Sequence, residues 1–367
     1  MSWAWRVATV AGIPINVHGT FAILILFILL SGLASGSGVA SAVASVLFIL
    51  AIFATIILHE LGHALTARRF GIKTRDITVL PIGGLARLER MPDVPRQELW
   101  VALAGPAVNL VIGAGCYVLM IAASGTAPAL TLDPSAAGFL GRFTAVNFAL
   151  AIFNMVPAFP MDGGRALRAL LAERIDYTRA TEVAASIGQG LALVFGLVGL
   201  FANPVLIFIA LFVWMGASSE ATAVTLRGAL AGAPVSRAMV TDFRTVRGGS
   251  PLSEVVELVL MGAQRDFPVM DETGLEIVGI LSRDQLVSGL STVGSAGRVE
   301  QAMTTTFETA DAREMLDSAY IRLQGSSAPV LPVLHDGRVV GLLTAENVAE
   351  YVMIRGAMGS RSGRFFA

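Results

Sequence analysis

The chain has 367 residues, of which 54% are hydrophobic and only 14% are charged, whereas a soluble domain carries about 25% charged residues. This composition excludes an ordinary soluble protein and indicates a membrane protein. Residues 1–226 carry 24 of the 53 charges, and residues 227–367 carry the other 29. We therefore expect an apolar domain followed by a smaller soluble one. The net charge of −1 gives no broad cationic surface, so we expect no nucleic-acid partner.

Five apolar runs in the first part contain no Asp, Glu, Lys or Arg, and a membrane span needs about 20 apolar residues. The runs are residues 17–34, 40–58, 99–123, 143–159 and 183–219. The last is long enough for two short spans, divided by a turn at Asn203-Pro204. The sequence therefore predicts about six transmembrane helices. The small residues at 31–42 also fit a signal-peptide cleavage region, but Arg6 alone is a weak basic start for one.

The loops between these runs differ in charge, and this difference predicts the orientation of the spans. Loops 35–39, 124–141 and 202–203 contain no Lys or Arg. The loops on the opposite side hold Arg68, Arg69, Lys73, Arg75, Arg87, Arg90, Arg96, Arg165, Arg168, Arg174 and Arg179. Basic loops stay in the cytoplasm, so we expect both termini and the soluble domain to lie on the cytoplasmic side of a prokaryotic cell membrane.

The second run ends in His59-Glu60-Leu61-Gly62-His63. Positions i and i+4 share one face of a helix, so the two imidazoles can bind one metal ion together. The Glu between them is then placed to polarise a water molecule. A pair of solvated histidines is the simpler alternative. It is disfavoured because a charged Glu at the end of an apolar span costs about 2–3 kcal/mol unless it has a function or a partner.

Zinc in a hydrolase normally takes three protein ligands and keeps a fourth position for water. The best candidate for the third ligand is Asp162, which follows the fourth run in a segment broken by two prolines and two glycines. Irregular backbone at membrane depth is tolerated only where it packs in protein or lines a wet cavity. A cap for the following helix is the alternative role for Asp162. His18 suits a helix end or a group beside the ligands, and His335 suits a surface turn.

Two asparagines are further candidates for the site. Asn154, eight residues before Asp162, offers an uncharged donor to a substrate carbonyl or to the oxyanion formed from it. Asn109 follows the small residues 104–107, which permit close helix contact. It is a second polar group expected near the metal and the substrate.

Taken together, two motifs in the apolar part resemble the site-2 protease family of intramembrane zinc metalloproteases. The motifs are His59-Glu60-x-x-His63 and Asn154-x-x-Pro157-x-x-Pro160-x-Asp162-Gly163, and the resemblance covers roughly residues 10–225. The roles it implies are one zinc ion held by His59, His63 and Asp162, proton transfer by Glu60 and substrate positioning by Asn154. The substrates it implies are single transmembrane helices of regulatory proteins, cut in or near the membrane.

Residues 76–89 alternate between apolar and polar side chains on both sides of Gly83-Gly84 and predict a short hairpin. The resemblance implies a membrane-associated β segment of this kind near the site. An exposed strand edge can hold an unwound substrate by β-augmentation, which makes Gly83 and Gly84 candidate substrate-binding residues. A plain cytoplasmic loop is the alternative.

An internal repeat occupies residues 235–355. The recurring segments are 235–239 with 299–303, 267–269 with 331–333, and 279–282 with 341–344, at offsets of 64, 64 and 62 residues. Each half predicts the order helix, strand, turn, strand, helix. The pair resembles two cystathionine-β-synthase (CBS) repeats, which in many relatives bind an adenine nucleotide in the cleft between them.

This second resemblance implies a nucleotide site that involves Ser282 and Thr344, with Gln285 and Asn347 at the positions where the family has Asp. An amide bonds a ribose hydroxyl less strongly than a carboxylate does. The alternative is therefore a module that binds no nucleotide and only forms a homodimer.

These observations predict a polytopic α-helical membrane protein with a short membrane-associated β segment and a soluble α/β CBS-pair domain. The expected parts are a zinc metalloprotease domain at 1–226, a cytoplasmic regulatory CBS pair at 227–355 and a disordered tail at 356–367. The expected activity is intramembrane proteolysis of a membrane-bound regulatory protein in contact with the lipid bilayer, modulated through the CBS pair. A CBS-gated channel or transporter is the alternative, but it leaves the metal-ligand motifs without a role.

Overall fold

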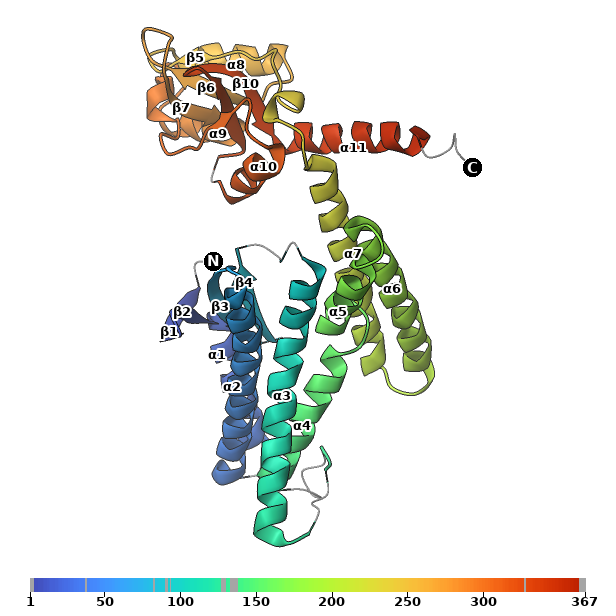
Figure 1. Ribbon diagram of the computed structural model, residues 1–367. Coiled ribbons are helices and arrows are strands. Elements are labelled where there is room, and N and C mark those ends of the chain that lie inside the picture. The colour runs from blue at the N-terminus through green and yellow to red at the C-terminus, as the bar shows by residue number, and fades with distance from the viewer. Residues whose placement is uncertain are drawn as a thin grey trace. The chain divides into compact units, whose positions relative to one another are not determined.

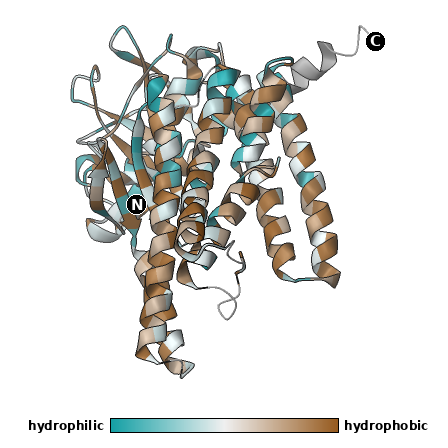
Figure 2. Cartoon of the chain, turned by 60° about the horizontal axis from the view of Figure 1, so that its bottom comes forward, coloured by the Kyte–Doolittle hydropathy of each residue, from teal (hydrophilic) through white to brown (hydrophobic). Residues whose placement is uncertain are grey.

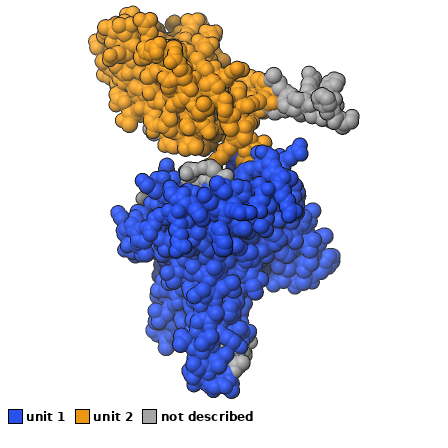
Figure 3. Space-filling model, in the orientation of Figure 1, with its two compact units in different colours: residues 1–223 blue, residues 224–367 orange. Residues whose placement is uncertain are grey.

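The computed structural model describes most of the chain and divides it into two compact units, residues 1–223 and 224–367 (Figure 3). The backbone is described for residues 3–36, 38–81, 83–89, 92, 94–126, 130–132, 138–326 and 328–362, and the side chains as far as residue 355.

The N-terminal unit combines a small sheet with a set of helices (Figure 1). Its elements in chain order are β1 (Ala4–Val10), β2 (Ile13–His18), α1 (Gly19–Ala34), α2 (Val39–Arg69), β3 (Thr74–Leu80), β4 (Gly83–Leu88), α3 (Pro95–Ser124), α4 (Phe139–Asn154), α5 (Asp162–Ala172), α6 (Tyr177–Phe201) and α7 (Val205–Leu230). The end of α7, residues 224–230, belongs to the second unit.

Four helices of the described chain, α2, α3, α6 and α7, are long and apolar enough to cross a membrane. Large apolar side chains remain exposed along them, among them Val111 and Phe208, and Figure 2 shows these helices as largely hydrophobic. The apolar helices α1 and α4 have only 16 residues each, or about 24 Å of length, which is less than the hydrocarbon thickness of about 30 Å. The structure thus gives four spans of full length, and the expected number of about six stays a prediction.

A four-stranded sheet packs beside α2, with strand order β1-β2-β3-β4. β1 and β2 are antiparallel, β2 and β3 are parallel, and β3 and β4 form the predicted hairpin, in which Leu80 pairs with Gly83. Of the two residues between them, Pro81 and Ile82, the second lies outside the described residues. The sequence reasoning missed β1 and β2, because the alternation in residues 13–18 is short and merges into the apolar run. Ile13 is nevertheless buried, in a cluster that includes Leu61 of α2.

Residues 155–161 connect α4 to α5 and pack closely against the first turn of α5. Gly163 and Gly164 make this packing possible, because a Cβ on Gly163 would lie 2.4 Å from the carbonyl oxygen of Val156. A Cβ on Gly164 would lie 2.6 Å from the carbonyl carbon of Ala158. The two glycines after Asp162 therefore allow the first turn of α5 to lie directly against the segment that precedes it.

The second unit confirms the repeat. Its elements are η1 (Val235–Arg237), β5 (Val246–Arg247), α8 (Leu252–Met261), β6 (Asp266–Met270), β7 (Ile277–Ser282), α9 (Arg283–Thr292), η2 (Val299–Gln301), β8 (Ala310–Asp311), α10 (Leu316–Gly325), β9 (Val330–His335), β10 (Arg338–Thr344) and α11 (Ala345–Ser362). Each half forms a three-stranded sheet, with orders β5-β6-β7 and β10-β9-β8. The two-residue strands β5 and β8 are too short to be seen as a pattern in the sequence.

The helix α11 extends further than the sequence reasoning expected. Its backbone is helical through Ser362, so residues 356–362 differ from the disordered tail that we expected from residue 356. No proline interrupts this stretch, and a helix already stabilised by packing continues through such residues readily. Residues 363–367 lie outside the described part of the chain.

The turn between β6 and β7 contains a carboxylate that should make folding sensitive to acid. Asp271 accepts hydrogen bonds from the Thr273 hydroxyl and from the backbone N–H groups of Leu275 and Glu276, and these bonds lower its pKa to about 2. A carboxyl group with a lowered pKa stabilises the fold above about pH 4, and this contribution disappears as the pH falls toward 2. We expect Asp271→Ala to lower the melting temperature at pH 6 and to have little effect near pH 2. A difference that is constant over this pH range would contradict the prediction.

Candidate active site

Three side chains from two helices meet at one point in the N-terminal unit. His59 and His63 lie one turn apart on α2, and Asp162 is the first residue of α5. The two Nε2 atoms are 3.1 Å apart, and each is 3.1 Å from Oδ2 of Asp162. Ligands bonded to a tetrahedral zinc ion at about 2.0–2.1 Å lie about 3.3 Å from one another, so this spacing fits such an ion. Among the described residues, this is the only group of three or more His, Cys, Asp and Glu with that arrangement.

The second nitrogen of each imidazole is already hydrogen-bonded. Nδ1 of His59 lies 2.5 Å from Oδ1 of Asn109, whose amide nitrogen donates to Oδ1 of Asn147 at 3.3 Å. Nδ1 of His63 lies 2.7 Å from the carbonyl oxygen of Val101. Both partners are acceptors, so each Nδ1 carries the proton and donates it. The lone pair of each Nε2 therefore points toward the shared position, as it does in metal sites whose histidines are oriented by an outer partner.

With both imidazoles neutral, the two Nε2 atoms and Oδ2 of Asp162 are all acceptors directed at the same position. All three residues are buried, at 6–7% exposure, so water does not readily separate them. One cation would satisfy all three acceptors. The alternative role of Asp162 as a helix cap is not supported, because the N-cap residue of α5 is Met161 and no side chain caps that end.

The glycine Gly105 of α3 leaves the space in which the two imidazoles meet. A Cβ at this position would lie 2.3 Å from Nε2 of His63 and 2.6 Å from Nε2 of His59. No side chain larger than a hydrogen atom fits there without moving both rings. The sequence reasoning identified the small residues around this position as a helix contact, and the structure shows that the contact adjoins the histidine pair.

Glu60 follows His59 on α2 and packs against the last strand of the sheet. It is half-buried. A Cβ on Gly84 of β4 would lie 2.7 Å from Cγ of Glu60, so the backbone of β4 packs against this side chain. Since β4 is the last strand in the sheet order, its outer edge has no strand partner among the described residues.

Each of the other predicted site residues forms a hydrogen bond within the protein. Asn154 ends α4 and donates through Nδ2 to the carbonyl oxygen of Leu150 at 3.0 Å, which occupies one of its two N–H donors. Asn109 is 1% exposed and bonded to His59, so it lies behind a histidine and not at a substrate-facing surface as we had expected. His18 is the N-cap of α1 and bonds Thr20, which agrees with the expected helix-end role.

Comparison with known proteins identifies the family. The profile of peptidase family M50 matches residues 47–195, and that of the CBS domain matches residues 235–292. A zinc metalloprotease of Methanocaldococcus jannaschii is 35% identical over 274 residues, covering 74% of this chain and 76% of the relative. The chain belongs to peptidase family M50, the site-2 protease family. It is therefore a site-2 protease-like metalloprotease with a C-terminal CBS pair, as the sequence motifs indicated.

Another relative and a solved structure are also similar to this protease. The Rip3 protein of Mycobacterium tuberculosis is 32% identical over 321 residues, covering 82% of this chain and 79% of the relative. The solved structure of the site-2 protease from Methanocaldococcus jannaschii shares 36% identity with a TM-score of 0.43, and it covers 60% of this chain and 95% of that one.

The CBS pair of the protease contains a cleft between its two repeats with a volume of about 1010 Å³. The four residues predicted at a nucleotide all line it, namely Ser282, Gln285, Thr344 and Asn347. These side chains bond to one another or to nearby groups. Ser282 and Gln285 form a capping box at the start of α9, and the Thr344 hydroxyl donates to Oδ1 of Asn347 at 2.5 Å.

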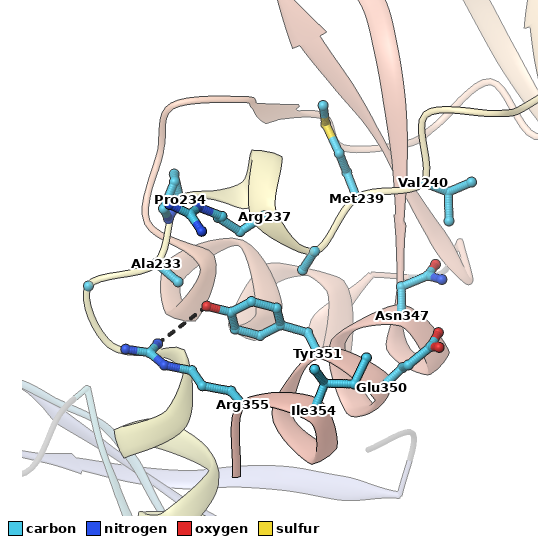
Figure 4. A pocket seen from close by; sticks show the side chains of 12 residues that line it. Ala233, Pro234, Arg237, Met239, Val240, Asn347, Glu350, Tyr351, Ile354 and Arg355 are labelled. Atoms are coloured by element: carbon cyan, nitrogen blue, oxygen red, sulfur yellow. Dashed lines mark hydrogen bonds between the residues drawn. The ribbon is translucent and has the colours of Figure 1, made fainter. Parts of the chain in front are cut away.

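A second cavity, of about 920 Å³, lies between residues 232–240 and the helix α11 (Figure 4). Arg355 of α11 donates to the carbonyl oxygen of Ala229 at 2.7 Å and thereby bonds the C-terminal turn of α7. A further contact of Arg355, with the hydroxyl of Tyr351 at 3.4 Å, is drawn in Figure 4. Asn347 lines this cavity as well as the cleft between the repeats, so α11 borders both.

The close contact between Gly105 and the two imidazoles predicts how a larger residue would affect metal binding. Because a Cβ at this position overlaps both Nε2 atoms, we expect Gly105→Ala to displace the imidazoles and to weaken metal binding at least tenfold, in the range seen when groups that orient metal ligands are lost. A Cβ on Gly115 of the same helix would have no atom within 4 Å, so Gly115→Ala is the matched control. Metal content and chelator competition measure the effect. Equal metal affinity in Gly105→Ala and Gly115→Ala would show that the two histidines do not share one ion.

Proposed function

We propose that this protein is an intramembrane zinc metalloprotease that cleaves a membrane-bound regulatory protein in or near its transmembrane segment. The observation that carries the proposal is the buried convergence of two imidazoles and one carboxylate, with Glu60 directly after His59 on the same helix. The relatives named as zinc metalloproteases support zinc as the metal, with one ion per chain. Channel or transporter activity gains no support, since it leaves this group without a role.

Within this proposal, His59, His63 and Asp162 hold the ion. Two histidines and one carboxylate are a ligand set typical of catalytic zinc, which keeps one coordination position free for water or substrate. When bound, zinc would lower the pKa of a water molecule and polarise the peptide carbonyl. Asn109 and the carbonyl of Val101 orient the two rings from behind.

Glu60 is proposed to move the proton during peptide hydrolysis. Its carboxylate would accept a proton from the attacking water and then donate it to the leaving amine, which contributes about 10²–10⁴-fold to a rate. The remaining N–H of Asn154 is available to a substrate carbonyl or to the oxyanion that develops from it.

A substrate helix must become extended before its peptide bond reaches these groups. The outer edge of β4 offers backbone hydrogen bonds to an extended segment. Because Gly84 has no side chain, that strand can lie directly against Glu60. We therefore propose that Gly83 and Gly84 lie along the substrate path, and that an unwound segment of a transmembrane protein adds to the sheet at β4.

We also propose that the protein has six spans, with both termini and the CBS pair cytoplasmic and functional domains at residues 1–226 and 227–355. The shorter helices α1 and α4 would cross a locally thinned bilayer, at modest cost per ångström of mismatch. The CBS pair is proposed to form a homodimer, which would cover some of its exposed apolar residues, among them Leu260, Met261 and Ile321.

The charges of the CBS cleft bear on which nucleotide it would take. Its acidic lining residues are Asp242, Asp266, Asp284 and Glu346, and its basic ones are Arg265 and Arg283. A lining with more carboxylates than guanidinium groups repels a triphosphate more than a monophosphate. The proposed regulatory ligand is therefore an adenine nucleotide with few phosphates.

The catalytic proposal is tested by Glu60→Gln. Because Glu60 is not one of the ligands, zinc content should stay at the wild-type level while cleavage of a single-span reporter in liposomes falls at least 100-fold. Glu89→Gln, the same change at an exposed position just after β4, is the control and should retain activity. Activity of Glu60→Gln within tenfold of wild type would exclude Glu60 from proton transfer, and a wild-type protein without zinc would overturn the proposal itself.

The regulatory proposal is tested by calorimetry on the full-length protein in detergent with AMP, ADP and ATP. AMP should bind most tightly because the cleft is acidic, and the double change Ser282→Ala with Thr344→Ala should weaken its binding about tenfold or more. Ser291→Ala on the exposed side of α9 is the control. No binding at millimolar concentrations of any of the three would leave the module as a homodimerisation or substrate-docking element.

A further inference from the structure

A fully buried arginine joins the helix that carries Asp162 to two other helices. Arg168 of α5 is 0% exposed, and its Nε donates to Oε1 of Glu98 on α3 at 2.8 Å. Its Nη2 bonds the same carboxylate oxygen, and its Nη1 donates to Oε1 of Glu220 on α7 at 2.5 Å. The sequence reasoning counted Arg168 only as one of the basic residues on the cytoplasmic side.

Two aromatic rings complete the surroundings of this guanidinium. The ring centroid of Phe159 lies 5.1 Å from its carbon Cζ, and that of Tyr177 lies 5.0 Å away. Both distances are within the range of cation–π attraction. Phe159 is itself fully buried and stands three residues before Asp162. The arginine therefore contacts the segment before the carboxylate as well as the helix after it.

The carboxylate of Glu98 lies close in sequence to another part of the metal site. Glu98 is one helical turn before Val101, the residue whose carbonyl oxygen accepts the proton of His63. The pair of Arg168 with Glu98 thus joins the helix that bears Asp162 to the turn of α3 that orients His63. One turn of α3 therefore contacts both Arg168, on the helix that begins with Asp162, and His63.

We propose that Arg168 is a positioning residue that sets the place of Asp162 relative to His59 and His63. This proposal rests on the proposed zinc site. The planar fork of a guanidinium bonds two carboxylates in fixed directions, which the rounded ammonium group of lysine does not reproduce. The fork therefore determines the position of α5 along its axis, and with it the position of Asp162.

A second arginine–glutamate pair joins the same two helices at the surface and can be compared with the buried one. This pair, Arg96 with Glu173, joins the first turn of α3 to the end of α5 at 2.9 Å, but its side chains are 81% and 37% exposed. An exposed pair of this kind contributes little, because water and salt screen it. The two pairs form a natural comparison of the same chemistry inside and outside the protein.

The test compares Arg168→Lys with Arg96→Lys in the full-length protein in detergent. Zinc affinity is measured by competition with a chelator, and ligand geometry by the visible absorption spectrum of the cobalt-substituted protein at saturating cobalt. We expect Arg168→Lys to raise the zinc dissociation constant about tenfold and to alter the cobalt spectrum, while Arg96→Lys matches wild type in both. A role in stability alone would lower the melting temperature and leave the cobalt spectrum unchanged.

A third variant covers the case in which Arg168→Lys does not fold. Glu98→Gln keeps the shape and an acceptor oxygen but removes the charge, so it should shift the cobalt spectrum in the same direction to a smaller extent. Wild-type cobalt spectra and zinc affinities in both Arg168→Lys and Glu98→Gln would overturn the positioning role while the zinc site stands. Failure of wild type to bind zinc or cobalt would instead refute the proposed function on which this role depends.

Discussion

The N-terminal unit brings two imidazoles and one carboxylate together at one buried position, and the packing around this position depends on their convergence. His59, His63 and Asp162 are 3.1 Å apart in pairs, and their neighbours serve to keep them so. Asn109 and Val101 bond the far nitrogen of each ring, and Gly105 leaves room for the near ones. Such an arrangement suits a shared cation, so the contacts that stabilise the local fold are also the ones that would orient the ligands.

The same constraint explains the backbone around the site. Asp162 comes from a different part of the chain than the two histidines. If α4 continued as an unbroken helix, Asp162 would lie beyond them. The break after Asn154 and the two glycines behind Asp162 allow α5 to begin beside α2 and α3. On the opposite side, Gly84 lets β4 approach Glu60, so a sheet edge and a carboxylate meet where an extended peptide could lie.

In both units, predicted site residues lie at the starts of helices: Asp162 begins α5, and Ser282 precedes α9. In the CBS pair, Ser282 and Thr344 are at equivalent positions of the two repeats, at the starts of α9 and α11, and both line the cleft. Asn347 borders this cleft and the second cavity, and α11 bonds the last turn of α7 through Arg355. Both of these contacts of α11 lie within the second unit.

The sequence by itself determined the family, the hairpin and the CBS repeat, and it predicted the residues that would hold a metal ion, because each depends on short spacings or on periodic apolar residues. His59 and His63 share a helix face whatever surrounds them, and residues 76–89 alternate in a way that only a strand uses. The partners of the ligands were decided by tertiary structure. The carbonyl of Val101 has no signature in a sequence, the closeness of Gly105 to two imidazoles depends on the packing of α3 on α2, and Arg168 looked like a charge on the cytoplasmic side until its two carboxylates were brought to it from α3 and α7. Contacts between residues 38 to 70 positions apart come from the packing of helices, and local pattern does not encode them.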